Sequence, residues 1–311
     1  MSTKAEAVAW ATAREAEIRA GKATGIQAGR TVGDAFDRYE KEVSATKRGM
    51  RFEQLRLAAI GNWQVSGKPF RDMKLADATS DVLGKWRDHR LSIDKVSGST
   101  VNRELNLLSN IFTVATREWK WIAASPTTDV RRPKESKPRD RLYTDGEIER
   151  LCLALGFDLD DEQPTETVSQ RVAIAFLYAI ETAMRAGEIC GLFPDDLAGR
   201  VAILTETKNG TKRKVPQSKR ALELLKLLPA PEKGGTVFGL TTKSLDTLFR
   251  KAKSRAGIDD ATFHDSRHLA ITRLAKKLHV LDLARMVGHR DLRQLQAYYN
   301  ERAEDIAIRL D

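Results

Sequence analysis

The stretch SQRVAIAFLYAIETAMRAGEICGL, from Ser169 to Leu192, decides the fold class of this chain. Its apolar core, Val172 to Ile180, is far shorter than the ~20 residues that cross a bilayer. A helix that is apolar on all sides is buried inside a protein. We therefore predict a long buried helix and a second one after it, inside a largely helical domain that begins near Tyr143.

One short sheet is expected within this domain. The stretch VAILTETKNGTKRKVP, from Val201 to Pro216, alternates apolar and polar residues around Asn209-Gly210. Asn-Gly between alternating segments is the strongest short signal for a β-hairpin. The other segments have helical patterns, such as TDGEIERLCLAL, in which Thr144 is the expected N-cap.

The preceding part of the chain has a helical pattern of its own. Residues 4–20 predict a short Ala-rich helix, and Thr31 is placed to cap the next one. Further along, an apolar residue recurs every three or four positions, which marks one face of a helix that Ser99 is expected to cap. The residues of this apolar stripe are Val101, Leu105, Leu108, Phe112 and Ala115.

Together these patterns predict a mainly α chain with a small β-hairpin or sheet. We expect four parts along the sequence. They are an N-terminal helical segment (1–30), a helical domain (31–128), a basic linker (129–142) and a mixed α/β domain (143–311).

The composition restricts the partners of this chain of 311 residues. Charged residues make up 31%, and the formal net charge is +10 at pH 7. A positive excess of this size is typical of proteins that bind nucleic acid or another anionic surface. The chain has no GxxxxGK loop for ATP, no secretory signal and no membrane span. Cys152 and Cys190 are too few for a disulfide framework, and we expect both to be buried and reduced, as in a cytoplasmic protein.

A basic stretch, RRPKESKPRDR, runs from Arg131 to Arg141. It is either a solvated linker or a strap along a phosphate backbone, and the charge of the whole chain favours the strap. Polar residues off the apolar stripe are also free to meet a partner. The candidate DNA-binding residues are Arg103, Arg117, Arg131, Arg132, Lys134, Lys137 and Lys212.

Four of the five histidines lie between His264 and His289. The stretch FHDSRHLAITRLA places His264, Arg267 and His268 on one helical face. An arginine inside the cluster repels a divalent metal, and no His-Glu-x-x-His pattern is present, so no metal is expected. Arginine and histidine together suit a phosphate group.

Other candidates for chemistry have two interpretations each. Arg185, within apolar helical sequence, either pairs with Glu188 as a structural residue or points a guanidinium into a cleft with Glu188 supporting it. Lys208 precedes the Asn-Gly turn and is either a surface lysine or a cation delivered to a leaving oxygen. Tyr298 and Tyr299 are either core aromatics or include a nucleophile.

Four segments, in chain order, resemble the signature segments of the tyrosine recombinase (phage integrase) family: TAMRAGEICGL, TKNGTKRKVP, FHDSRH and VGHRDLRQLQAYY. The resemblance covers the chain from about residue 143 to its end. The upstream helices resemble the core-binding domain of that family in pattern and length. The resemblance implies a two-domain DNA clamp, with a helical core-binding domain and a mixed α/β catalytic domain.

The resemblance also implies roles for single residues. Arg185 and Arg267 match the two arginines that clamp the scissile phosphate, and Lys208 matches the general acid for the leaving 5′ oxygen. The nucleophilic tyrosine of the family lies nine residues after its last histidine position, which selects Tyr298 over Tyr299. The remaining matches are His264 and His289 as catalytic histidines, with Glu188 and His268 as supporting residues.

The implied activity is DNA strand cleavage and rejoining through a 3′-phosphotyrosine, without metal, ATP or other cofactor. An integrase of a phage or mobile element is the favoured function. A shufflon-type DNA invertase of the same family is the alternative, and a type IB-like topoisomerase or a non-catalytic DNA-binding protein are the remaining hypotheses.

The implied partners are double-stranded DNA target sites and three further copies of the chain, in a homotetramer on two sites. Accessory DNA-bending proteins are a further partner class, and no membrane is involved. The expected location is the cytoplasm of a bacterial cell, at the nucleoid. The last stretch, ERAEDIAIRLD, predicts a short amphipathic helix that packs either within its own chain or on a neighbouring protomer.

Overall fold

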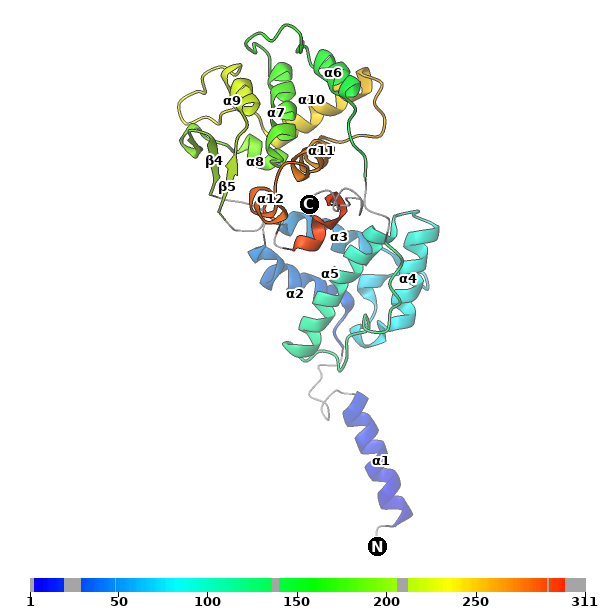
Figure 1. Ribbon diagram of the computed structural model, residues 1–311. Helices are drawn as coiled ribbons and strands as arrows, with labels where there is room; N and C mark the ends of the chain where they lie inside the picture. The colour runs from blue at the N-terminus through cyan, green and yellow to red at the C-terminus, as the bar shows by residue number, and fades with distance from the viewer. Residues whose placement is uncertain are drawn as a thin grey trace, which may run out of the picture. The chain divides into compact units, whose positions relative to one another are not determined.

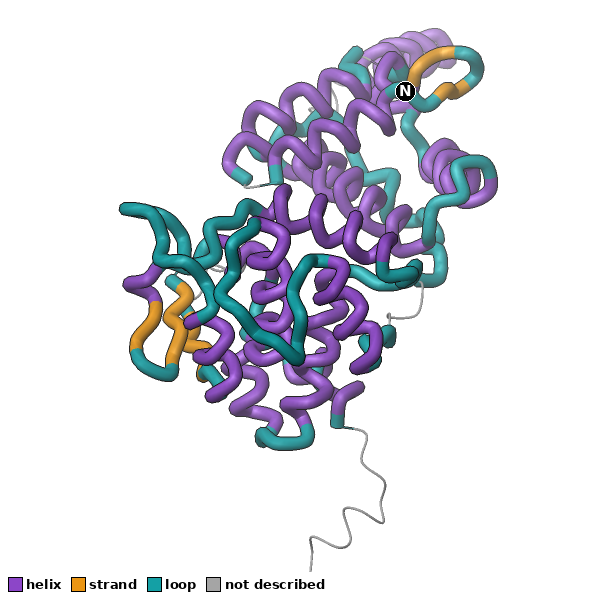
Figure 2. Tube along the Cα trace, turned by 90° about the horizontal axis from the view of Figure 1, so that it is seen from above, coloured by secondary structure: helices purple, strands orange, loops and turns teal. Residues whose placement is uncertain are grey.

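The computed structural model describes residues 3–19, 29–47, 49–135, 140–205, 212–289 and 291–299. The chain divides into two compact units, Met1–Pro138 and Arg139–Asp311. Helices predominate in both, and the strands are short and antiparallel (Figures 1 and 2). The predicted fold class, mainly α with a small sheet, is confirmed.

The first unit is built from helices and one small hairpin. Thr31 caps α2 as predicted, because its hydroxyl accepts a hydrogen bond from the Asp34 amide at 3.0 Å and the Asp34 carboxylate accepts one from the Thr31 amide at 2.9 Å. The elements are α1 (Lys4–Arg19), α2 (Val32–Glu42), α3 (Met50–Gly61), β1 (Gln64–Val65), β2 (Lys68–Pro69), α4 (Ser80–Ser92) and α5 (Gly98–Arg117), with short 3₁₀ turns at Ser44–Thr46, Phe70–Asp72 and Leu75–Asp77.

Helix α5 carries the core of this unit. All five residues of its predicted apolar stripe are fully buried, and Phe36, Phe70 and Trp86 belong to the same core. The predicted cap was wrong by two residues: Ser97, not Ser99, accepts the hydrogen bond from the Thr100 amide, at 3.3 Å. The helix therefore begins at Gly98, where a Cβ would overlap the carbonyl oxygen of Lys134.

The second unit places a buried helix among several others. Thr144 caps its first helix through a capping box with Glu147, as predicted. The elements are α6 (Asp145–Ala154), α7 (Val168–Thr182), α8 (Ala186–Cys190), a 3₁₀ turn (Pro194–Asp196), β3 (Leu197–Ala198), β4 (Val201–Leu204), β5 (Arg213–Pro216), α9 (Lys219–Lys226), α10 (Thr242–Arg255), α11 (Phe263–Ala275), α12 (Val280–Val287) and the 3₁₀ turns Leu292–Gln294 and Gln296–Tyr298.

The predicted buried helix is α7, which packs against α6, α9, α10 and α11 (Figure 1). Phe176 on α7 meets Phe249 and Phe263, with ring centroids 5.5 and 6.2 Å apart. A second, smaller cluster joins α11, α12 and the end of α7, and Tyr298 packs against it. This smaller cluster brings the ends of three helices together, and these ends carry the charged residues described below.

The small sheet of the second unit has the order β3-β4-β5, all antiparallel, and lies at the edge of the helices (Figure 2). Its register pairs Leu204 with Arg213 and Val201 with Pro216. The strands confirm a hairpin in this stretch. The predicted Asn209-Gly210 turn and Lys208 lie outside the described residues.

Two expectations from the composition concern burial. Cys152 and Cys190 are buried and unbonded, and burial raises the pKa of their thiols to about 12 and about 11. Both thiols therefore stay protonated at neutral pH and serve as small core side chains.

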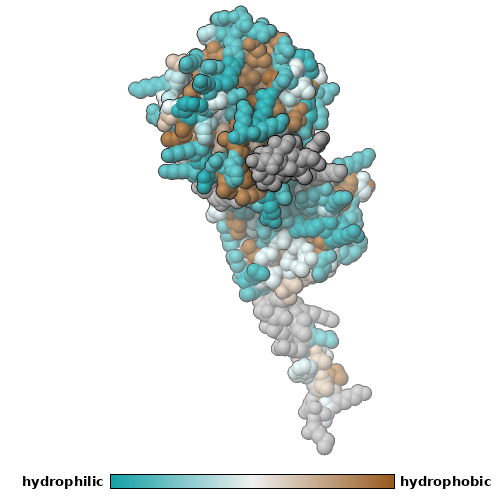
Figure 3. All heavy atoms as spheres, viewed as in Figure 1, coloured by the Kyte–Doolittle hydropathy of each residue, from teal (hydrophilic) through white to brown (hydrophobic). Residues whose placement is uncertain are grey.

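Hydrophilic side chains cover most of the described surface seen in Figure 3. None of the helices within the described ranges has the length and apolar character needed to cross a membrane.

Candidate active site

Arg185 and Glu188 sit at the break between α7 and α8. Ala183 ends α7 with a φ of +54°, a left-handed conformation that non-glycine residues rarely adopt. The Glu188 carboxylate accepts two hydrogen bonds from Arg185. One comes from the Arg185 backbone amide at 2.8 Å, and the other comes from its side-chain Nη1 at 3.0 Å. The Arg185 side chain remains 26% exposed. Arg185 therefore pairs with Glu188, as one of its two interpretations predicts, and its guanidinium is still accessible to a ligand.

Arg267 lies one turn into α11 and is 3% exposed. Its guanidinium donates to the carbonyl oxygens of Ala183 and, at 2.6 Å, Val287. Burial and the nearby cations of Arg185 and Arg213 lower the pKa of Arg267 to about 9. The side chain is still a cation at neutral pH, held by dipoles and not by a carboxylate of its own.

Arg213 on β5 is a third cation of this pocket, and the sequence analysis missed it. Its guanidinium donates to Glu188 Oε2 at 2.7 Å and to the Val287 carbonyl oxygen at 3.1 Å. A signal was available: in a strand, alternate residues share a face, so Arg213 faces the same way as the buried Val215. Glu188 therefore accepts from two guanidiniums, those of Arg185 and Arg213, and Arg213 shares the Val287 carbonyl oxygen with the third, that of Arg267.

Two histidines border these cations. Burial, followed by the charge of Arg267, lowers the pKa of His264, and the same two causes lower the pKa of His289 to about 4. His289 Nε2 lies 3.3 Å from Arg267 Nη2. Both imidazoles are therefore neutral near pH 7 and able to accept a proton.

The two tyrosines differ in what their hydroxyl groups contact. Tyr299 donates to the Leu278 carbonyl oxygen at 2.8 Å. Tyr298 is half-buried, with its ring 5.0 Å from that of His268. Burial raises the pKa of Tyr298, while the positive charge of Arg267 lowers it. The charge of Arg267 thus acts on the pKa of Tyr298, and the choice of Tyr298 over Tyr299 as the nucleophile stays a prediction.

His268 is the last predicted residue of this cluster. It is partly buried on α11, and its Nδ1 is buried without a partner among the described residues, as is Nδ1 of His289. The structure thus brings six predicted residues into one region: Arg185, Glu188, His264, Arg267, His268 and His289, with Tyr298 beside them. No group of three or more His, Cys, Asp or Glu within the described ranges is arranged to hold a metal.

Comparison with known proteins decides the family. Residues 157–305 match the model of the phage integrase family. A putative integrase/recombinase of Haemophilus influenzae is 39% identical over 303 residues, which cover 96% of this chain and 80% of the relative. The chain is a tyrosine recombinase of the phage integrase family. Members of this family cut and rejoin DNA.

Two further comparisons describe the recombinase. A shufflon-specific DNA recombinase of Escherichia coli is 34% identical over 287 residues, covering 89% of this chain and 71% of the relative. The crystal structure of a lambda integrase dimer bound to a COC′ core site matches with a TM-score of 0.69 and 20% identity, over 88% of this chain and 78% of the other. The structural likeness supports the fold.

The first unit of the recombinase contains a cleft between α3 and α5. Its volume is about 270 Å³. Its lining combines the apolar Phe52 and Leu107 with charged and polar side chains, which are Glu53, Arg56, Thr100, Arg103, Glu104, Asn106 and Asn110. Arg103 and Arg117, the two candidates on α5, are both exposed. Side chains of these types contact phosphates and base edges in protein–DNA complexes.

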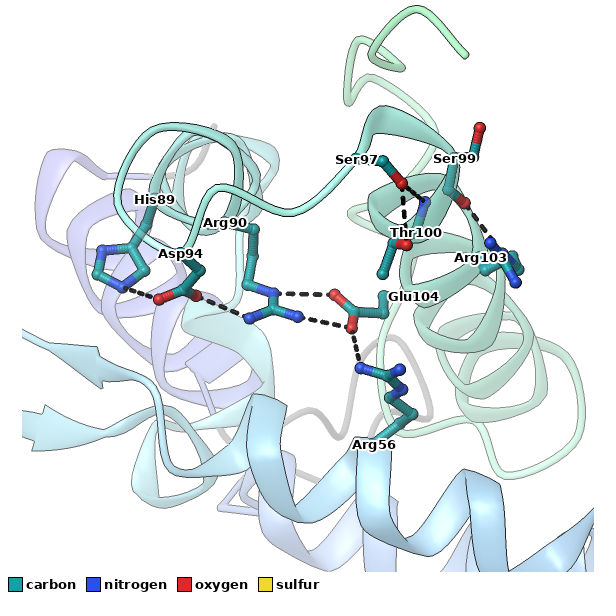
Figure 4. Close-up of polar contacts among 9 residues, drawn as sticks. All are labelled: Arg56, His89, Arg90, Asp94, Ser97, Ser99, Thr100, Arg103 and Glu104. Carbon is teal, nitrogen blue, oxygen red and sulfur yellow. Dashed lines mark hydrogen bonds and ion pairs between the residues drawn. The ribbon is translucent and has the colours of Figure 1, made fainter. Parts of the chain in front are cut away.

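A buried carboxylate fixes the cations beside this cleft (Figure 4). Glu104 is 3% exposed and accepts from Arg56 Nη1 at 2.9 Å and from Arg90 Nε and Nη2 at 3.0 and 2.8 Å. Arg90 also donates to Asp94 at 2.7 Å. The role of Glu104 was not predicted from the sequence, because its partners come from two other helices.

The basic linker begins along the surface of the first unit. Arg132 Nη1 donates to the Asn102 carbonyl oxygen at 3.0 Å, and Asn102 Nδ2 donates to the Pro133 carbonyl oxygen at 3.0 Å. The side chains of Arg131, Arg132 and Lys134 are exposed, as is Lys212 next to β5 in the second unit. Lys137 lies outside the described residues.

Proposed function

We propose that the recombinase cleaves DNA by transesterification at the pocket of Arg185, Arg267 and Tyr298. Tyr298 Oη attacks the scissile phosphorus, the bond from phosphorus to the 5′ oxygen breaks, and a 3′-phosphotyrosyl ester forms. The phenolic proton passes to a neutral imidazole, His264 or His289, and the 5′ oxygen takes its proton from Lys208. Rejoining is the same exchange in reverse, so the phosphoester energy is conserved.

The charge of the pocket supports this proposal most strongly. Arg185 and Arg213 share the carboxylate of Glu188, and Arg267 adds a third cation bonded to backbone carbonyl oxygens, so this region offers positive charge that a phosphate can balance. Buried charges without partners are costly. An attack on phosphorus increases the negative charge on the phosphoryl oxygens, and preorganised N–H donors stabilise that charge where it develops.

We propose integration of a phage or other mobile element as the biological role. The putative integrase/recombinase at 39% identity favours this role. DNA inversion is the second candidate, because the shufflon-specific relative is 34% identical over most of this chain. The two roles share the chemistry and differ in how the two DNA sites are arranged.

Exchange between two duplexes requires four strands to be cut, so we propose four protomers on two double-stranded sites. In this proposal the helical unit (31–128) and the linker (129–142) supply further phosphate contacts, and the catalytic domain (143–311) supplies the chemistry. Such an enzyme works at the nucleoid of a bacterial cell. The expected C-terminal helix, whose residues lie outside the described ranges, is proposed to link neighbouring protomers.

Plasmids with two copies of the DNA that flanks the gene test this function. The copies are placed in direct or inverted orientation, and purified protein is added with and without a host extract that supplies DNA-bending proteins. Integrase-type recombination predicts deletion circles from direct copies, whereas an invertase acts only on inverted copies. Relaxation of a plasmid that lacks the copies, without any recombinant product, would indicate a topoisomerase and contradict the proposal.

A further inference from the structure

We propose that Arg213 is a positioning residue, which attaches the hairpin of Lys208 to the phosphate-binding arginines. This inference rests on the proposed function, in which Lys208 is the general acid. Arg213 stands at the first position of β5, and Lys208 precedes it by five residues in the sequence. The position of β5 relative to α8 and α12 therefore decides where the base of that hairpin lies.

The contacts of Arg213 join three elements that are distant in sequence. Through Glu188 Oε2, at 2.7 Å, the guanidinium reaches α8, where the same carboxylate holds Arg185. Through the Val287 carbonyl oxygen, at 3.1 Å, it reaches the end of α12, where Arg267 also donates. One side chain thus shares a partner with each of the two arginines proposed to clamp the phosphate.

Contacts with the protein bury the side chain of Arg213. Its side chain is 6% exposed, whereas that of Arg185 is 26% exposed. Both of its Nη atoms donate to protein acceptors, one to Glu188 and one to Val287, so its guanidinium joins two elements of the protein. An arginine can span two acceptors with its fixed fork of N–H groups, but a lysine offers one ammonium point charge.

Gly288 shows how closely the chain surrounds this side chain. Gly288 caps α12 with a φ of +71°, and a Cβ there would lie 2.9 Å from Arg213 Nη1 and 3.1 Å from its Cδ. Alanine at this position would therefore displace the guanidinium while leaving its charge and Glu188 in place. This gives a second way to disturb Arg213 without removing the cation.

The role of Arg213 is tested by single-turnover cleavage of nicked target DNA in two forms. One form has the natural 5′ oxygen at the scissile phosphate, and the other has a bridging sulfur. A thiolate leaves without receiving a proton, so the sulfur form needs no general acid. A positioned general acid contributes roughly 10²–10⁴-fold to a rate. Lys208→Ala should therefore cleave the oxygen substrate slowly and the sulfur substrate at close to the wild-type rate. Arg267→Ala should cleave both substrates slowly.

We expect Arg213→Lys to behave like the Lys208 variant. The lysine keeps a cation beside Glu188 but cannot also bond to the Val287 carbonyl oxygen. Cleavage of the oxygen substrate should therefore slow, and the sulfur substrate should restore most of the lost rate. Gly288→Ala should show the same pattern in weaker form. Lys214→Ala is the matched control, because its side chain is exposed on the same strand; its ratio of sulfur to oxygen rates should equal that of the wild type.

Three results would overturn the inference. If both Arg213→Lys and Gly288→Ala cleave the oxygen substrate at the wild-type rate, Arg213 positions nothing. Equal slowing on oxygen and sulfur, with thermal unfolding showing a folded protein, would assign Arg213 to the phosphate clamp. If Lys208→Ala is equally slow on both substrates, the general acid of the proposed function is wrong, and the coupling fails with it.

Discussion

Arg213 and Arg267 donate hydrogen bonds to the same acceptor, the carbonyl oxygen of Val287, at 3.1 and 2.6 Å. Val287 is the last residue of α12, and the final carbonyls of a helix lack partners within it and carry partial negative charge. Two cations therefore use an acceptor that the helix leaves free. The arginines of the pocket are thus held in place before any DNA binds.

Loss of the buried clamp arginine should reduce chemistry more than binding. Replacing Arg267 with alanine removes a cation that we propose to clamp the scissile phosphate, and removal of such a donor costs roughly 10²–10³ in rate. Single-turnover cleavage of nicked DNA measures this loss, and filter binding measures affinity. Arg250→Ala, an exposed arginine on α10, is the control and should cleave normally. Unchanged cleavage by Arg267→Ala would remove this residue from the mechanism.

The stability of the catalytic unit should depend on pH through His289. Its pKa is lowered to about 4 by burial and by Arg267, and the unfolded value is near ~6.5. Between these values the unfolded chain binds a proton that the folded chain does not, so the free energy of unfolding rises with pH. Urea unfolding from pH 5 to 7 should show a shallower rise in His289→Gln. Equal slopes in both proteins would contradict a depressed pKa.

Glu104 should be essential for the stability of the first unit. Glu104→Ala leaves Arg56 and Arg90 without their shared buried carboxylate, and losing a hydrogen bond to a charged group costs about 1.5–3 kcal/mol. The exposed pair of Lys85 and Asp81 is the comparison; Asp81→Ala should cost at most ~1 kcal/mol. Urea unfolding measures both, and a similar small effect for Glu104→Ala would show that its ion pairs are not formed.

Arg103 should contribute to DNA affinity through charge. If it contacts a phosphate, Arg103→Ala should weaken binding across unrelated sequences and reduce the slope of log K against log salt by about 0.9. Lys85→Ala, an exposed cation on α4 of the same unit, should leave the slope unchanged. Equal slopes for wild type and Arg103→Ala would exclude a phosphate contact at this residue.

Much of the fold could be predicted from local sequence patterns, because helix caps and apolar stripes depend on residues that are close together in the chain. The apolar stripe of α5 is buried as expected, and Thr31 and Thr144 cap the helices that follow them. The prediction that Ser99 caps α5 was wrong because two serines, Ser97 and Ser99, flank Gly98 and both are suitable caps. The linker backbone passes close to Gly98, and this contact favours a helix that begins there. Such a contact is tertiary and leaves no periodic signal.

The candidate active site also contains residues that could be predicted from the sequence and residues that could not. The family resemblance selected the residues that meet at the ends of α7, α11 and α12, and the structure places them in one region. Arg213 and Glu104 were not predicted because tertiary contacts decide their burial. Each is buried by partners distant in sequence: Glu104 bonds to Arg56, 48 residues away, and Arg213 bonds to Val287, 74 residues away.

The tyrosine that bonds to DNA tests the central claim most directly. Nicked target DNA is incubated with the protein, the covalent adduct is isolated under denaturing conditions, and the linked peptide is sequenced by mass spectrometry. We predict a phosphodiester link on Tyr298, no adduct from Tyr298→Phe, and normal adduct formation by Tyr299→Phe, whose lost hydrogen bond to Leu278 affects only stability. A link on Tyr299, or an adduct that persists in Tyr298→Phe, would contradict the account.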